Sequence, residues 1–153
     1  MVATIFSDKD RVYLDANVFI YLVEADTYPA MRQAVTQLFS ACDAGHIIPV
    51  TSTLTLAEVL PVPLRQGDNV LVQIYRGLLT TSPVLEVKPV SLSILDAAAV
   101  IRSQTSIKLP DAIHIATALQ ADCAYFVSND QGLKLPKALP IQWISLTDIL
   151  LAH

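Results

Sequence analysis

The sequence predicts an α/β fold in which helices cover a central, mostly parallel sheet. Short apolar runs alternate along the chain with stretches of helical periodicity, which is the pattern of βαβ units. Runs such as IIPV and AYFV are apolar at every position, as strands buried on both faces must be. Apolar residues make up 53% of the 153 residues and charged residues only 16%, so the chain can bury a large core and is not disordered.

The first half of the chain is expected to form two strands and four helices. In chain order these elements are strand 12–14, helix 17–24, helix 31–39, strand 47–50, helix 53–60 and helix 68–79. The helix at 31–39 has apolar residues at i, i+3, i+4, i+7 and i+8 from Met31, which places them on one face. Pro61 and Pro63 are expected to end the helix at 53–60, and Gly67 and Pro83 bound the next one.

The second half of the chain is expected to add three strands and three helices. They are strand 85–90, helix 91–102, helix 110–121, strand 124–127, strand 141–144 and helix 147–151. Ser91 is a good N-cap, and Pro110 stands at the first position of its helix, where proline is favoured. The chain has only four glycines and no repeat or linker-like segment, so residues 1–153 are expected to form a single domain.

The charge, hydropathy and cysteine content argue against several classes of protein. Ten Lys and Arg against 14 Asp and Glu give a formal net charge of −4, which disfavours a simple basic nucleic-acid-binding module. The mean hydropathy of +0.49 is high, but the longest segment without Asp, Glu, Lys or Arg is 44–57, which is too short for a membrane span. Cys42 and Cys123 fit no disulfide or zinc pattern. The sequence therefore predicts a cytoplasmic protein that has two buried thiols and does not bind membranes.

Polar side chains follow two of the expected strands. Asp15 comes directly after strand 12–14, and Ser128, Asn129 and Asp130 come directly after strand 124–127. Because parallel strands end at the same edge of a sheet, where ligands bind, these side chains are expected to lie together. A structural interpretation is also open: Asp15 or Asn17 could be a helix N-cap, and Asp130 could belong to a turn.

Two further acids stand in expected helices. Glu58 is surrounded by apolar residues in TLTLAEVLPVPL, with no other charge between Asp43 and Arg65. It either lies on an exposed stripe or points at a charged partner, and a metal ion is a natural candidate because no basic residue is near it in sequence. Asp111 lies in the first turn of a helix, where the helix dipole favours an acid whatever its function. His114 follows three residues later on the same face, and a D-x-x-H pair alone is a weak sign of a metal site.

Four segments carry these residues between apolar flanks. They are VYLDANVFIYL around Asp15, STLTLAEVL with Ser52 and Glu58, LPDAIHIATAL with Asp111, and FVSNDQGL with Asp130. In this order and on the expected elements, the segments resemble the motifs of the PIN-domain proteins, especially the toxin subunits of VapBC-type toxin–antitoxin pairs. Each motif alone is weak, but the four together extend over nearly the whole chain.

The resemblance implies a three-layer α/β/α sandwich with a central, mostly parallel sheet, and an endoribonuclease that needs Mg²⁺ or Mn²⁺. It assigns catalysis and metal binding to four acids, namely Asp15, Glu58, Asp111 and Asp130. It assigns supporting polar roles to Asn17, Ser52 and Ser128. An RNA substrate, a homodimer and a small antitoxin whose tail covers the acidic site are implied as well. His114 falls where the family accepts several residue types, so the resemblance gives it no role in the site.

Carboxylates are ligands that Mg²⁺ and Mn²⁺ prefer, so this assignment agrees with the chemistry of the residues themselves. We expect Asp15 and Asp111 to make the primary metal contacts, with Glu58 and Asp130 completing the set. Bound ions of this kind activate water for attack on a phosphodiester. Without a cation, one of several packed carboxylates would take up a proton.

The chain departs from the family pattern in two places. Ala16 stands where Thr is common, and the stretch QGLKL after Asp130 lacks the aromatic residue that the family often has there. Lys108 and Lys134 flank the third and fourth motifs and could meet phosphate. The missing aromatic residue and the low basic content leave open a non-catalytic binding or regulatory module. A PIN nuclease with a housekeeping role in RNA processing and a phosphoryl-transfer or signalling domain also stay open. The apolar face that begins at Met31 could be core, which is favoured, or a dimer or antitoxin surface.

Overall fold

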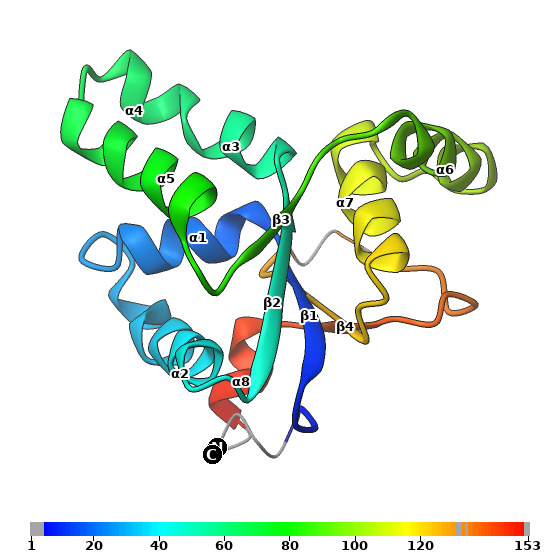
Figure 1. The fold of residues 1–153 in the computed structure, drawn as a ribbon, viewed down its shortest axis with the longest axis horizontal. Helices are drawn as coiled ribbons and strands as arrows, with labels where there is room; N and C mark the ends of the chain where they lie inside the picture. The colour runs from blue at the N-terminus through cyan, green and yellow to red at the C-terminus, as the bar shows by residue number, and fades with distance from the viewer. Residues whose placement is uncertain (1–4, 131–132, 134, 152–153) are drawn as a thin grey trace.

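A computed structural model shows five parallel strands in one sheet (Figure 1). The structure describes residues 5–130, 133 and 135–151. The strands are β1 (Asp10–Leu14), β2 (Ile47–Ser52), β3 (Glu86–Lys88), β4 (Tyr125–Val127) and β5 (Gln142–Ile144). Their order across the sheet is β3-β2-β1-β4-β5, so β1 is central and has β2 and β4 as its neighbours. The predicted α/β fold with a parallel sheet is confirmed.

Alternate residues of the central strands point to opposite faces of the sheet, and both faces are buried. Val12 and Leu14 of β1 and Val127 of β4 lie in one apolar cluster. Tyr13 of β1 and Phe126 of β4 lie in a second cluster on the other face. All five side chains are fully buried, so the sheet needs a layer of helices on each side.

Helices form these two layers, which lie to the left and right of the sheet in Figure 1. The first layer contains α1 (Ala16–Val23), α2 (Arg32–Asp43), α5 (Asn69–Thr81) and α8 (Leu146–Leu151). The second contains α7 (Leu109–Gln120), with α6 (Leu92–Gln104) packed against it. Shorter helical elements are η2 (Pro29–Met31), α3 (Leu54–Val59) and α4 (Pro61–Arg65). The three-layer α/β/α sandwich is therefore confirmed.

Pro61 and Pro63 end the predicted helix as expected, and Pro61 also begins another one. α3 ends at Val59, one residue before the predicted end, and α4 begins at Pro61. Proline fits the first position of a helix because the backbone N–H that it lacks would have no partner in the helix. The predicted strand at 85–90 is also shorter, since the structure forms a strand only at Glu86–Lys88.

The apolar face that begins at Met31 belongs to the core. Val35 and Leu38 of α2 are fully buried in the first cluster. Met31 and Phe39 are partly buried and pack against the same cluster. This face is thus used inside the molecule, and the alternative of a dimer or antitoxin surface is wrong for it.

Both cysteines are buried free thiols, as predicted. Burial raises the pKa of Cys42 and of Cys123 to about 12, so each thiol stays protonated and chemically inert at neutral pH. Among the helices that the structure describes, none is both long and apolar enough to cross a bilayer.

An ion pair joins two strands of the sheet across the strand between them. Arg11 of β1 donates to Glu86 of β3 through Nη1 at 3.1 Å and Nη2 at 2.6 Å, and its Nε donates to the carbonyl of Ala121 at 2.6 Å. The Arg11 hydrogen bond and charge lower the pKa of Glu86, against the opposing effect of burial. A lowered pKa in the folded protein gives stability that is present above the unfolded value of 4.5 and is lost as the pH falls through the folded pKa.

We expect Glu86→Gln to lower the free energy of unfolding at pH 7 by about 0.5–1 kcal/mol, a figure reduced for the solvent that screens this partly exposed pair. The difference from the wild type should shrink as the pH is lowered below 4.5. Urea unfolding at a series of pH values measures this effect. Asp26→Asn is the control. The side chain of Asp26 is fully exposed, so its ion pair with Arg32 should contribute less to stability than the pair of Arg11 and Glu86 does. A Glu86→Gln loss that is equal at pH 3 and pH 7 would contradict the expectation.

Candidate active site

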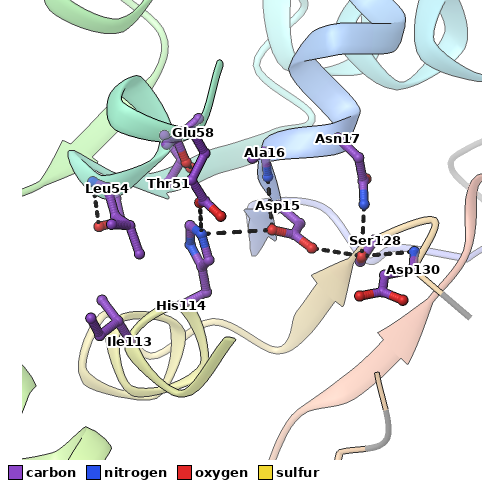
Figure 2. A network of polar contacts seen from close by, with 12 residues as sticks. Asp15, Ala16, Asn17, Thr51, Leu54, Glu58, Ile113, His114, Ser128 and Asp130 are labelled. Atoms are coloured by element: carbon purple, nitrogen blue, oxygen red, sulfur yellow. Dashed lines mark hydrogen bonds and ion pairs between the residues drawn. The ribbon is translucent and has the colours of Figure 1, made fainter. Parts of the chain in front are cut away.

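The acids predicted from the sequence come together at the carboxyl edge of the sheet. Asp15 follows β1 and Asp130 follows β4, while Glu58 lies on α3 and Asp111 in the first turn of α7. Figure 2 shows Asp15 between Glu58 on one side and Asp130 on the other. Asp111 belongs to the same group, because the charges of the other three acids act on its carboxyl.

Asp15 is both the N-cap of α1 and the centre of this group. Its Oδ1 accepts a hydrogen bond from the backbone N–H of Ala16 at 2.8 Å, and its Oδ2 accepts one from the hydroxyl of Ser128 at 2.7 Å. The backbone N–H of Asp15 donates to the carbonyl of Val127 at 3.0 Å. The residue is 6% exposed, so β1, β4 and α1 together fix its carboxylate.

Ser128 connects the residues that follow β1 with those that follow β4. Its hydroxyl donates to Asp15 and accepts from Asn17 Nδ2 at 3.2 Å and from the backbone N–H of Asp130 at 3.1 Å. Asn17 Oδ1 in turn accepts from the backbone N–H of Asn129 at 3.2 Å. The supporting roles expected for Asn17 and Ser128 therefore correspond to contacts that hold the two acids in place.

Ser52 supports the site from further away. Its buried hydroxyl accepts from the backbone N–H of Leu54 at 3.0 Å and so fixes the turn at which α3 begins. Beside it, the hydroxyl of Thr51 donates to the carbonyl of Leu14 at 2.8 Å and lies 2.8 Å from the hydroxyl of Thr55. These contacts tie α3, which carries Glu58, to the end of β1.

Glu58 points at a partner from a distant part of the chain. Its Oε1 is hydrogen-bonded to Nε2 of His114 on α7, and only a third of its side chain is exposed. The imidazole of His114 is fully buried, its Nε2 lies 3.7 Å from Asp15 Oδ1, and its Nδ1 lies 2.5 Å from the hydroxyl of Tyr13. His114 thus belongs to the site, although the family pattern gives it no role. The signal in the sequence was its spacing, three residues after Asp111.

The electrostatics show an excess of negative charge. Burial raises the pKa of Asp111, and the charges of Asp15, Asp130 and Glu58 raise it further, whereas His114 opposes them. Burial works to lower the pKa of His114, but its hydrogen bond to Glu58 and the charges of Asp15 and Asp111 outweigh burial and raise it. The neighbouring carboxylates therefore contribute to both shifts.

A family model described as the PIN domain matches residues 12–138 of the chain. The chain belongs to the PIN-domain family. The match includes Asp15, Glu58, Asp111 and Asp130. No curated protein is significantly similar to the chain in sequence.

Solved structures share the fold of this PIN domain. A toxin–antitoxin complex from Klebsiella pneumoniae is 21% identical with a TM-score of 0.57, and the match covers 79% of this chain and 88% of that one. VapBC2 from Rickettsia felis, bound to a DNA fragment from their promoter, is 13% identical with a TM-score of 0.67, over 88% of this chain and 98% of that one. VapC20 from Mycobacterium tuberculosis, a sarcin-ricin loop cleaving toxin, is 16% identical with a TM-score of 0.61, over 75% and 86% of the two chains.

The residues of this PIN domain fit a divalent ion in donor type and in charge. Carboxylate oxygens are hard ligands of the kind that Mg²⁺ and Mn²⁺ take, and a cation would offset the repulsion by which the neighbouring carboxylates help to raise the pKa of Asp111. Over the described residues, no three carboxylate, imidazole or thiol groups already meet as a metal-binding cluster.

The residues around this group add little positive charge. Lys108 is exposed and stands at the N-cap of α7, three residues before Asp111. Lys134 lies outside the described residues, as do two of the residues between it and Asp130. In the stretch where the family often has an aromatic residue, Leu133 is buried in the second cluster.

Proposed function

We propose that this PIN domain is a Mg²⁺- or Mn²⁺-dependent endoribonuclease and the toxin component of a type II toxin–antitoxin pair. The observation that carries the proposal is the gathering of Asp15, Glu58, Asp111 and Asp130 at one edge of the sheet, where the charges of the other three acids act on Asp111. Membership of the PIN-domain family supports a nuclease. The structural neighbours reported above are toxin–antitoxin proteins, and one of them is described as a sarcin-ricin loop cleaving toxin, which supports the choice of a toxin.

In this mechanism Asp15 and Asp111 hold the divalent ion, and Glu58 and Asp130 complete the set of ligands. The ion, when bound, supplies the charge that activates water and offsets the negative phosphodiester in an in-line displacement. Ser128 keeps Asp15 oriented through its 2.7 Å hydrogen bond and links it to the backbone of Asp130. The contacts of Ser128 thus fix the carboxylate of Asp15 beside the backbone of Asp130.

The proposal extends to the surroundings of the domain. Residues 1–153 form one PIN-like domain that works as a homodimer and binds a small antitoxin, whose tail covers the acidic site. Exposed apolar side chains such as Val62 and Leu64 on α4 and Leu92 on α6 support the existence of protein partners. The two free thiols support a cytoplasmic location, because a reducing compartment keeps them free.

A non-catalytic PIN-fold module is the second candidate function. It is favoured by one observation, which is that the described residues contain no ready-made metal-binding cluster. Such a module would bind a partner without cutting RNA. It would do so through the edge of the sheet that carries Asp15, Glu58, Asp111 and Asp130, here called the acidic edge. The two candidates therefore differ in whether a divalent ion produces any reaction.

Cleavage of RNA by the purified chain separates the two candidates. We expect cleavage with Mg²⁺ or Mn²⁺, loss of cleavage with EDTA, and recovery when the ion is added back. Asp15→Asn should remove the activity, whereas Asp43→Asn, an exposed acid at the end of α2, should retain it. Cleavage that persists in EDTA, or that Asp15→Asn leaves intact, would refute the proposed function. No cleavage by the wild type at any concentration would favour the non-catalytic module.

A further inference from the structure

Tyr13, His114 and Glu58 form a hydrogen-bonded chain that leads from the core to the acidic edge. The hydroxyl of Tyr13 lies 2.5 Å from His114 Nδ1, and His114 Nε2 contacts Glu58 Oε1. Tyr13 and His114 are fully buried, whereas a third of the Glu58 side chain meets solvent. These hydrogen bonds therefore connect the buried Tyr13 with the carboxylate of Glu58, which stands on the six-residue helix α3.

The chemistry of the three groups fixes where the hydrogen bonds point. A carboxylate only accepts, so His114 Nε2 carries the hydrogen that it donates to Glu58. Both ring nitrogens then have a partner, because Nδ1 meets the hydroxyl of Tyr13. The Tyr13 ring is itself held by stacking on Phe126, with centroids 5.1 Å apart and an angle of 18° between the planes. The imidazole is fixed at both ends and cannot turn without losing a buried hydrogen bond.

Packing alone does not explain a histidine at this position. Every residue of α7 from Ala112 to Ala118 is buried, and all but His114 and Thr117 are alanine or isoleucine. An apolar residue would suit these surroundings, whereas a buried imidazole is tolerated only while both nitrogens are hydrogen-bonded. Thr117 satisfies its own hydroxyl within the helix, by donating to the carbonyl of Ile113 at 2.7 Å. His114 instead points its Nε2 out of the helix, toward Glu58 and Asp15.

We propose that His114 is a positioning residue that holds the Glu58 carboxylate beside Asp15, in the orientation that divalent-ion binding requires. This inference rests on the proposed function, since it assigns a task within the same site. Without the contact, Glu58 can rotate toward solvent from its short helix and leave the ion to the other three acids. Groups that hydrogen-bond metal ligands in this way commonly contribute a factor of about 10–100 in metal affinity.

Two substitutions at His114 separate positioning from packing. The amide nitrogen of glutamine can occupy the place of Nε2 and keep the donor to Glu58, whereas the shorter asparagine reaches only the place of Nδ1 beside Tyr13. We expect His114→Asn to weaken Mn²⁺ binding by about 10–100-fold and His114→Gln to restore most of it. Calorimetric titration of the purified chain with Mn²⁺ measures both, and melting without metal shows whether each variant is folded.

A double-mutant cycle tests whether His114 acts through Glu58. In a Glu58→Gln background, His114→Asn should weaken Mn²⁺ binding little further, because the group that it positions is already changed. Should His114→Asn fail to fold, Tyr13→Phe takes its place, since it removes the hydroxyl that fixes Nδ1 and keeps the ring on Phe126. That variant is expected to weaken Mn²⁺ binding too, and an unchanged affinity would count against the inference.

The outcomes for the inference and for the proposed function are distinct. If the wild type binds no Mn²⁺, or Asp15→Asn binds it as well as the wild type does, the proposed function fails. If the wild type binds Mn²⁺ and Asp15→Asn does not, the site is real, and the His114 variants decide the inference. Equal binding by wild type and His114→Asn, or equal losses in His114→Asn and His114→Gln, would overturn it.

Discussion

Replacing Asp111 by asparagine is expected to reduce RNA cleavage by a factor of about 10³ or more, which corresponds to roughly 4 kcal/mol of transition-state stabilisation. Asp111 is one of the two acids proposed to make the primary metal contact. The amide removes the negative charge and one of the two oxygens, so the ion loses much of its hold at this position. The loss should appear in the cleavage step even when the protein is in large excess over RNA.

The same substitution should leave the metal-free protein folded and slightly more stable. The pKa of Asp111 is raised by burial and by the charges of Asp15, Asp130 and Glu58, so its ionised form is disfavoured in the folded chain. A raised pKa means that the protonated carboxyl favours folding below the unfolded value of 3.8, and that this contribution is lost as the pH rises through the folded pKa. Asparagine removes the repulsion at neutral pH but also the favourable contact with the helix dipole. The net gain is about 0–1 kcal/mol after allowance for solvent screening, or up to about 4 °C in Tm.

Single-turnover cleavage and melting with and without Mn²⁺ check both parts. Mn²⁺ should raise the Tm of the wild type, because a ligand that binds only the folded state stabilises it, and should hardly raise that of the variant. Asp96→Asn, an exposed acid on α6, is the matched control and should behave as the wild type does in both measurements. Cleavage by Asp111→Asn within tenfold of the wild type would contradict the primary role of this acid.

Phe126→Ala is expected to lower the free energy of unfolding by about 3–5 kcal/mol. Phe126 is fully buried on β4, where it faces the second cluster and stacks on Tyr13. β4 is hydrogen-bonded to β1 on one side and to β5 on the other. This pairing limits how far the backbone can move to fill the cavity that the ring leaves. A loss of this size is a large share of the roughly 5–15 kcal/mol that stabilises a typical domain.

Urea unfolding of Phe126→Ala beside Phe39→Ala measures how much of the loss comes from this position. Phe39 lies on α2, is only partly buried and contacts Phe19 at a centroid distance of 6.0 Å, so its truncation should cost clearly less. Equal losses of unfolding free energy in the two variants would contradict the expectation that the ring of Phe126 stabilises the fold more than that of Phe39. Because Phe126 also supports Tyr13, the cavity should loosen the contact between Tyr13 and His114 as well.

The sequence was informative where the structure depends on local patterns. Runs such as AYFV and IIPV are apolar throughout because both faces of the sheet are covered, and this predicts a parallel sheet without any knowledge of pairing. Pro61 correctly predicted the end of α3 but not the start of α4, because proline is favoured both just after one helix and at the first position of the next. The choice between the two depends on whether the following residues find a surface to pack on. Pro63, buried in α4, shows that they did.

The site was only partly predictable, because its decisive contacts join distant residues. Asp15 and Asp130 were expected together, since parallel strands end at one edge of a sheet. The partner of Glu58 was not, because His114 lies 56 residues further along the chain and faces Glu58 only after α3 and α7 have packed. The two interpretations of Asp15 also proved compatible, since one carboxylate oxygen caps α1 and the other accepts from Ser128.

The central place of β1 in the sheet has a consequence for the synthesis of the protein. β1 is among the first segments to be made, but its neighbour β4 follows much later, and the hydrogen bond between Ser128 and Asp15 spans 113 residues. Contacts of such long range form late, after the intervening chain has been ordered. The acidic edge therefore cannot assemble until at least residue 130 has left the ribosome. For a chain proposed to cut RNA, this delay keeps the translating ribosome and its messenger away from a working nuclease during most of synthesis.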